Sequence, residues 1–161
     1  MTSSVFQLAF YYYRLLHPTV QVTARLPLAQ AVHESANFTS NVFETNNNAL
    51  GMMAPKSRET TCLNRGGKGF AVYGSVLDGI ADYILWLEAL GLTDDAKLDA
   101  HIKAGKYATD KAYYTKIQRV VTELKAADKY IAPGAIYAGA GVAGVAAALG
   151  LVAGISSAIK S

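Results

Sequence analysis

The chain has 161 residues and a formal net charge of +3. This length is enough for one domain with a modest core. This mild charge, without an arginine cluster or a nucleic-acid-binding motif, gives no indication of a nucleic-acid partner and favours an anionic polymer or a lipid surface. Cys62 is the single cysteine, so no internal disulfide can form. The N-terminus has no basic start, and Arg14 interrupts its apolar run, so we expect no cleavable secretory signal.

The first part of the chain is predicted to be helical. An aromatic-rich helix is expected over residues 6–16, ahead of Pro18. A second helix begins near Pro27 and carries Glu34 near its end. Residues 37–48 are polar and rich in turn formers, so we expect a loop there.

A β-hairpin is predicted in the middle of the chain. Strand-forming residues 59–63 and 68–73 flank the glycine-rich turn of residues 64–67. The chain is therefore expected to be mainly α with a small β-hairpin lobe, and a groove between the two lobes suits an extended polymer.

Three helices are predicted after the hairpin. Ser75 begins one that runs to about Leu90. Thr93 or Asp94 begins a shorter one, to about residue 104, and Thr109 or Asp110 begins the last. The apolar face of this last helix is predicted to consist of Tyr114, Ile117, Val121 and Leu124.

The C-terminal part differs in composition from the rest. Residues 130–159 carry no charged side chain, and residues 135–159 are long enough, at about 1.5 Å per residue, to cross a hydrocarbon layer of about 30 Å. Gly150 and Gly154 have the spacing that lets helices pack closely in lipid. We expect a domain at residues 1–129 and a transmembrane anchor at 130–161; a buried helix or a flexible glycine-rich tail are the alternatives.

Glu34 is the strongest candidate for chemistry. It closes an apolar, helix-forming run, and the polar turn Asn47-Asn48 and Gly51 follow. An apolar backing disfavours the ionised carboxyl, so the pKa of Glu34 should rise and let it donate a proton near neutral pH. Glu59, on the predicted hairpin, is the acid expected across the groove, and glycoside cleavage commonly uses two such carboxyls. By spacing alone, Glu59 also fits a solvated strand residue.

A metal site is not expected. His33-Glu34 begins like a zinc-binding HExxH motif, but position 37 is asparagine, and His17 and His101 are distant in sequence. No cofactor is predicted either. Tyr107, ahead of the last helix, is expected either to line the groove floor or to pack on the core.

Four segments, in order, resemble the β-N-acetylglucosaminidases of glycoside hydrolase family 73, the family of flagellum-associated peptidoglycan hydrolases and many autolysins. They are LAQAVHESANF at residues 28–38, NNALGM at 47–52, FAVYGS with IADY at 70–75 and 80–83, and YATDKAY at 107–113. One departure is that Ser35-Ala36-Asn37-Phe38 stands where the family has SGWG.

This resemblance implies a lysozyme-like α+β fold around a glycan groove. It places the family's general acid on Glu34, the second carboxylate on Glu59 and the assisting tyrosine on Tyr107. The contacts to the glycan are expected from Phe38, Asn47, Asn48, Phe70, Tyr73 and Tyr113.

The substrate implied by the resemblance is peptidoglycan, cut at the β-1,4 bond between N-acetylglucosamine and N-acetylmuramic acid. With the apolar tail, the prediction is a membrane-anchored lytic enzyme of a phage virion, bound to glycan strands, to a bilayer through residues 135–159 and to other virion membrane proteins. The alternatives are an inactive structural membrane protein of a virion that keeps the fold, and a lytic transglycosylase.

Overall fold

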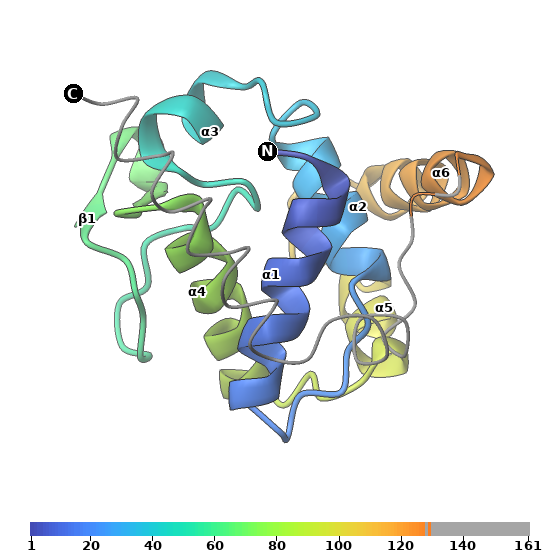
Figure 1. The fold of residues 1–161 in the computed structure, drawn as a ribbon, viewed down its shortest axis with the longest axis horizontal. Helices are drawn as coiled ribbons and strands as arrows, with labels where there is room; N and C mark the ends of the chain where they lie inside the picture. The colour runs from blue at the N-terminus through green and yellow to red at the C-terminus, as the bar shows by residue number, and fades with distance from the viewer. Residues whose placement is uncertain (128, 130–161) are drawn as a thin grey trace.

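The computed structural model describes residues 1–127 and 129, which are mainly helical with a two-stranded antiparallel sheet. Figure 1 shows this sheet at one side of the molecule and the last helix at the opposite side. The elements in chain order are α1 (Ser3–Leu16), α2 (Arg25–Glu34), α3 (Asn41–Asn46), β1 (Asn64–Arg65), the 3₁₀ turn η1 (Gly67–Gly69), β2 (Ala71–Val72), α4 (Val76–Ala89), α5 (Asp95–Lys103) and α6 (Tyr113–Ala126).

Capping side chains set several helix starts and confirm the sequence prediction there. The Ser75 hydroxyl accepts the backbone N–H of Asp78 at the start of α4. The Asp94 carboxylate accepts that of Lys97 at the start of α5. Each cap satisfies a donor that the first turn of a helix leaves without an intrahelical partner.

The core lies where α1 packs on α4 and α2 packs on α6. Phe10 of α1 and Tyr83 of α4 are fully buried, with ring centroids 6.5 Å apart. From α6, Tyr113, Ile117, Val121 and Leu124 are buried, whereas Tyr114 is half-buried and donates its hydroxyl to Asp99. Three positions of the predicted face are therefore buried, and Tyr114 packs against the core at its edge; Tyr113, the first residue of α6, is the buried position that was not predicted.

The hairpin is shorter than predicted. Residues 59–63 are not a strand, and pairing is limited to Asn64 with Val72 and Arg65 with Ala71. Side chains of this segment instead bind α4: Thr61 donates its hydroxyl to the carbonyl of Asp78. The short helix α3, within the predicted loop of residues 37–48, was also missed, although Ser40 caps it through the N–H of Phe43.

The predicted membrane helix and the domain boundary at residue 129 lie outside the described residues. Within residues 1–127 and 129, no helix has both the length and the apolar character that a bilayer crossing requires.

A buried carboxylate ties the hairpin segment to the helices. Asp82 of α4 is fully buried, and its carboxylate accepts one hydrogen bond from each terminal nitrogen of Arg58, both at 2.7 Å. It also accepts the hydroxyls of Thr60 at 2.6 Å and Tyr73 at 2.7 Å. Burial alone would raise the pKa of Asp82, but these donors outweigh it and hold the pKa below its ordinary value.

The turn after α2 is left-handed over three successive residues. Ala36, Asn37 and Phe38 have φ of 49°, 58° and 65°. Ala36 and Phe38 stand where the family's SGWG has its two glycines. Both side chains therefore occupy a conformation that glycine adopts more easily. Phe38 offsets part of that cost, because it is 7 % exposed and packs on Phe6 and Phe43.

The Asp82 network predicts a stability effect. Replacing the buried Asp82 with asparagine leaves the half-buried Arg58 guanidinium without its counter-ion, so we expect Asp82→Asn to lower the free energy of unfolding by about 3 kcal/mol in urea denaturation at pH 7. Because the folded-state pKa of Asp82 is lowered, this difference should shrink as the pH falls below about 4.

The matched control is Asp110→Asn, which removes an exposed partner of Lys116. Exposed pairs contribute little, so this variant should denature like the wild type. Equal stability of the two variants at pH 7 would contradict the anchoring role of Asp82.

Candidate active site

Glu34 is the last residue of α2, and its side chain is half-buried. The preceding residues Leu28, Ala29, Gln30 and Ala31 are fully buried, so the carboxyl stands at the end of a dry helix face. Burial is the main cause that raises the pKa of Glu34; a hydrogen bond from Tyr113 and the nearby His33 ring act in the opposite direction. The raised pKa matches the sequence expectation for this carboxyl.

Gly51 lies directly against the Glu34 carboxylate. A β-carbon added at Gly51 would stand 2.7 Å from Oε2 of Glu34, a distance at which atoms clash. Its φ of +63° also disfavours other residues. The loop after α3 therefore reaches the acid only because this position has no side chain.

A pocket of about 250 Å³ opens beside Gly51. Trp86 of α4 and Tyr107 supply aromatic surface, and Arg58 and Lys106 supply positive charge. The remaining lining residues come from one loop: Gly51, Met52, Met53, Ala54 and Pro55. Glu34 thus stands at the edge of a concave site with aromatic and cationic walls, as suits a sugar polymer that carries negative charge.

Tyr107 is within this site, and its hydroxyl is already engaged. It donates to the backbone carbonyl of Leu50 at 2.5 Å. The ring stacks on Tyr113, with centroids 5.6 Å apart, and meets Trp86 edge-on at 5.4 Å. Burial raises the pKa of Tyr107 well above its ordinary value, so the phenol stays protonated. Both alternatives from the sequence therefore apply: Tyr107 lines the pocket and also packs on its neighbours.

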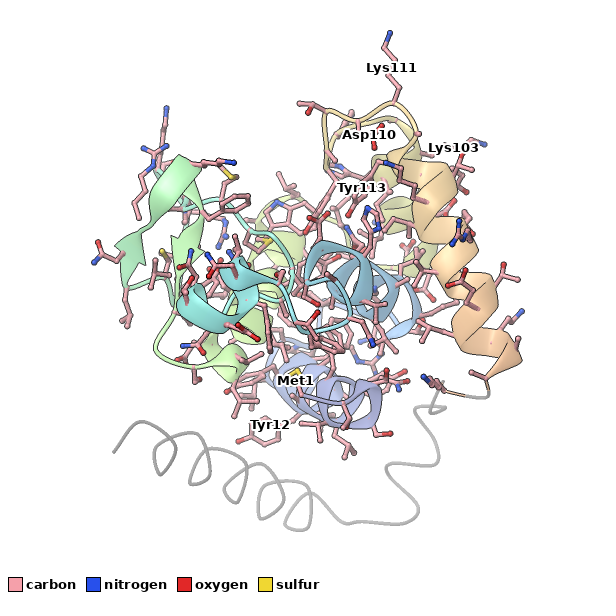
Figure 2. All side chains as sticks on the ribbon, turned by 90° about the horizontal axis from the view of Figure 1, so that it is seen from above. Met1, Tyr12, Lys103, Asp110, Lys111 and Tyr113 are labelled. Atoms are coloured by element: carbon pink, nitrogen blue, oxygen red, sulfur yellow. The ribbon has the colours of Figure 1, made fainter. Side chains whose placement is uncertain are left out.

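Beneath Glu34 lies a buried polar chain. Tyr83 donates its hydroxyl to Oε1 of Gln30 at 2.6 Å, and Nε2 of Gln30 approaches the Tyr113 oxygen at 3.4 Å. Tyr113 in turn lowers the pKa of the Glu34 carboxyl, against the larger effect of burial. Figure 2 shows Tyr113 below the loop that carries Asp110 and Lys111.

Glu59 is exposed and lies outside the set of residues that line the pocket. It follows Arg58, which does line the pocket and donates to the Glu59 backbone carbonyl at 2.7 Å. Glu59 therefore adjoins the pocket through Arg58, as Glu34 adjoins it through Gly51, and neither carboxylate is among the residues that line it.

Most of the predicted glycan-binding residues hold the scaffold together. Asn48 is buried, and its amide bonds the backbone of Met52 and Ala71. Asn47, in the left-handed conformation, donates to the carbonyl of Tyr73. These side chains shape the loop that carries Gly51.

The predicted aromatic contacts are also largely internal. Phe38, Tyr73 and Tyr113 are buried, and the hydroxyl of Tyr73 donates to Asp82. Phe70 is half-buried and pairs through its backbone with Met53. The sequence alone does not distinguish an aromatic side chain that is buried from one that faces a ligand.

Sequence reasoning missed the pocket residues Arg58, Trp86 and Lys106 and the buried Gln30 and Tyr83. Trp86 could have been predicted as a binding residue, because it is the single tryptophan of the chain. Arg58 and Lys106 lie in different loops, and no local pattern joins them. In the part of the chain that the structure describes, no three histidine, cysteine, aspartate or glutamate side chains gather as metal ligands.

One of three comparisons with known proteins identifies a family. Residues 11–126 match the family model Glucosaminidase, described as mannosyl-glycoprotein endo-beta-N-acetylglucosaminidase. Searches of curated proteins and of solved structures found no match to the chain. The family match spans most of the sequence and contains the acid, the pocket and the buried polar chain. The chain therefore belongs to the glucosaminidase family and is a peptidoglycan-degrading glycoside hydrolase.

Proposed function

We propose that the enzyme cuts the β-1,4 bond between N-acetylglucosamine and N-acetylmuramic acid, with Glu34 as the general acid. The observation that carries the proposal is a half-buried carboxyl with a raised pKa, set against Gly51 at the edge of the pocket. A glycosidic oxygen is a poor leaving group until it is protonated, and a carboxyl with a raised pKa keeps its proton to higher pH and can supply it.

The pocket walls favour this glycan. The half-buried Trp86 ring offers an apolar face on which a sugar ring can stack. Arg58, held in place by Asp82, and the exposed Lys106 favour a polymer whose muramic acid and stem peptides bear carboxylates.

Glu59 is proposed as the second carboxylate. As an anion it would stabilise positive charge at the anomeric carbon or activate water. Its support is its place next to the pocket-lining Arg58. In the alternative mechanism, the acetamido group of the substrate acts as an internal nucleophile. Glu59 then need not touch the sugar carbon. Tyr107 is proposed to assist: since its proton is donated to Leu50, its oxygen is available to accept from a water or a sugar hydroxyl.

We also propose that the uncharged residues 130–159 anchor the enzyme in a membrane, and that it serves a phage virion by opening the wall locally. The proposal depends on composition alone.

Glu34→Gln tests the reaction. Replacing the carboxyl with an amide keeps the shape of the side chain and removes the proton donor. The rate at which reducing ends are released from purified peptidoglycan should therefore fall about 100-fold or more. Because the acid must be protonated, wild-type activity should decline as the pH rises through the raised pKa of Glu34. Mass spectrometry of the products distinguishes hydrolysis from transglycosylation, which would leave anhydro-sugar ends.

Glu44→Gln, an exposed glutamate on α3, is the matched control and should keep full activity. Glu59→Gln should lose activity if Glu59 is the second carboxylate and keep most of it if the acetamido group acts instead. A wild type without any activity would support the inactive structural protein of a virion.

Gly51→Ala tests the packing against the acid. The added methyl group would stand 2.7 Å from Oε2 of Glu34 and must displace it, so kcat should fall by about 100-fold. Gly91→Ala is the control, because φ there is +65° and a β-carbon meets nothing within 4 Å. Both variants carry the same backbone strain, so equal kcat values would show that Gly51 does not position Glu34.

The membrane proposal predicts that the full chain floats with vesicles of phosphatidylethanolamine and phosphatidylglycerol in a density gradient. A chain that ends at residue 129 should remain in the soluble fraction, because it lacks the uncharged segment. Equal flotation of the two chains, or flotation of neither, would refute an anchor in residues 130–159.

A further inference from the structure

The two cationic side chains that line the pocket differ in what they already bind. Both terminal nitrogens of Arg58 donate to the buried carboxylate of Asp82 at 2.7 Å, and one of them also donates to the backbone carbonyl of Glu59. The Arg58 side chain is 16 % exposed. Because a carboxylate in direct contact balances the guanidinium charge, Arg58 attracts a further anion only weakly.

Lys106 is exposed, and its charge is not balanced in this way. Within residues 1–127 and 129, the ion pairs of the structure include none to its ammonium group. An ammonium group carries three donors and a full positive charge. Of the two cations that line the pocket, Lys106 is therefore the one whose charge is available to a ligand.

The end of α5 fixes the backbone of Lys106. The N–H of Gly105 bonds the carbonyl of Ile102 at 3.0 Å, and the N–H of Lys106 bonds the carbonyl of His101 at 3.3 Å. These two bonds form a Schellman motif, which requires a left-handed residue after the helix. Gly105, with φ of +69°, supplies it. The position of Lys106 relative to α5 is thus set by the helix end.

Aromatic contacts join this helix end to the pocket. The His101 ring meets the Trp86 ring edge-on, with centroids 5.5 Å apart. Tyr107, which follows Lys106, also meets Trp86 edge-on, at 5.4 Å. Lys106 therefore lies between two contacts of Trp86 along the chain. Its long, flexible stem can bring the ammonium group to the substituents of a sugar that stacks on Trp86.

Resting on the proposed cleavage of peptidoglycan, we propose that Lys106 is a specificity-determining residue that binds a carboxylate carried by the glycan strand. Peptidoglycan offers this chemistry in two places. One is the lactyl group of N-acetylmuramic acid where no peptide is attached, and the other is the stem peptide. Chitin, a neutral polymer of β-1,4-linked N-acetylglucosamine, offers neither. Lys106 thus lets the site favour the anionic polymer, although the sugars of both can stack on Trp86.

The experiment uses the full chain and two matched pairs of soluble strands. The first pair is a strand stripped of its peptides and the methyl ester of that strand, in which the lactyl carboxylates are neutral. The second pair is a peptide-bearing strand and its methyl ester. The preference ratio is kcat/KM for the charged strand divided by kcat/KM for its ester.

Lys106→Gln should lower the preference ratio about fivefold at low ionic strength. The change should lie mainly in KM, because the carboxylate keeps its charge throughout the reaction and is bound equally in the ground state and the transition state. The wild-type ratio should itself shrink at about 0.5 M salt, where ions screen the attraction. A fall in the first pair assigns the lactyl carboxylate as the ligand, and a fall in the second pair assigns the stem peptide.

Two further variants separate a local contact from the overall charge of the protein. Lys106→Arg keeps the positive charge and should keep most of the preference. Lys111→Gln removes the same charge from an exposed side chain outside the pocket lining. Figure 2 shows Lys111 at the tip of its loop, pointing away from the molecule. This variant should retain the wild-type preference ratio.

Unchanged ratios of Lys106→Gln in both pairs would overturn the role of Lys106. So would an equal fall in Lys111→Gln, or a Lys106→Arg ratio as low as that of Lys106→Gln. These results leave the proposed function intact as long as the wild type cleaves the strands and Glu34→Gln does not. A wild type that cleaves none of the four strands would instead refute the proposed function itself.

Discussion

The buried carboxylate of Asp82 is the constraint on which the site depends. It accepts four hydrogen bonds, two from Arg58 and one each from Thr60 and Tyr73, and all three donors lie in or beside the hairpin region. An ion pair of this kind rarely adds net stability over an apolar pair, but it is specific in geometry, because a bidentate guanidinium fits a carboxylate in one plane. Here that geometry fixes a small sheet, too short to be stable alone, against α4.

This anchoring also explains the composition of the pocket. Arg58 contributes a wall of the pocket and is held from behind by Asp82. The loop of residues 51–55 forms the adjoining wall, and Asn48 holds its start through bonds to Met52 and Ala71. Both walls are thus set by buried polar groups whose hydrogen bonds are satisfied, so the cleft is shaped before any glycan enters.

On the opposite side, α2 and α6 hold the acid. Glu34 ends a helix that is buried from Leu26 to Ala31, and Tyr113 begins the helix packed against it. The start of α6 at Tyr113, later than the capping pattern at Asp110 indicates, brings the Tyr113 ring between His33 and Tyr107. Tyr113 is therefore buried where α6 packs on α2, whereas Tyr107 also lines the pocket.

Three features could be predicted without coordinates: the helices capped by Ser75 and Asp94, the position of Glu34 at a helix end and, through four ordered segments, the family. These features are local: caps, apolar periodicity and short motifs act within a few residues of each other. The tertiary structure alone decided the roles of the remaining side chains. Phe38, Asn48 and Tyr73 belong to motif segments, yet they are internal, whereas Arg58, Trp86 and Lys106 form the pocket from three separate parts of the chain. Which face of a residue meets solvent, and which distant residues meet each other, depends on how helices and loops pack, and no spacing along one chain records that.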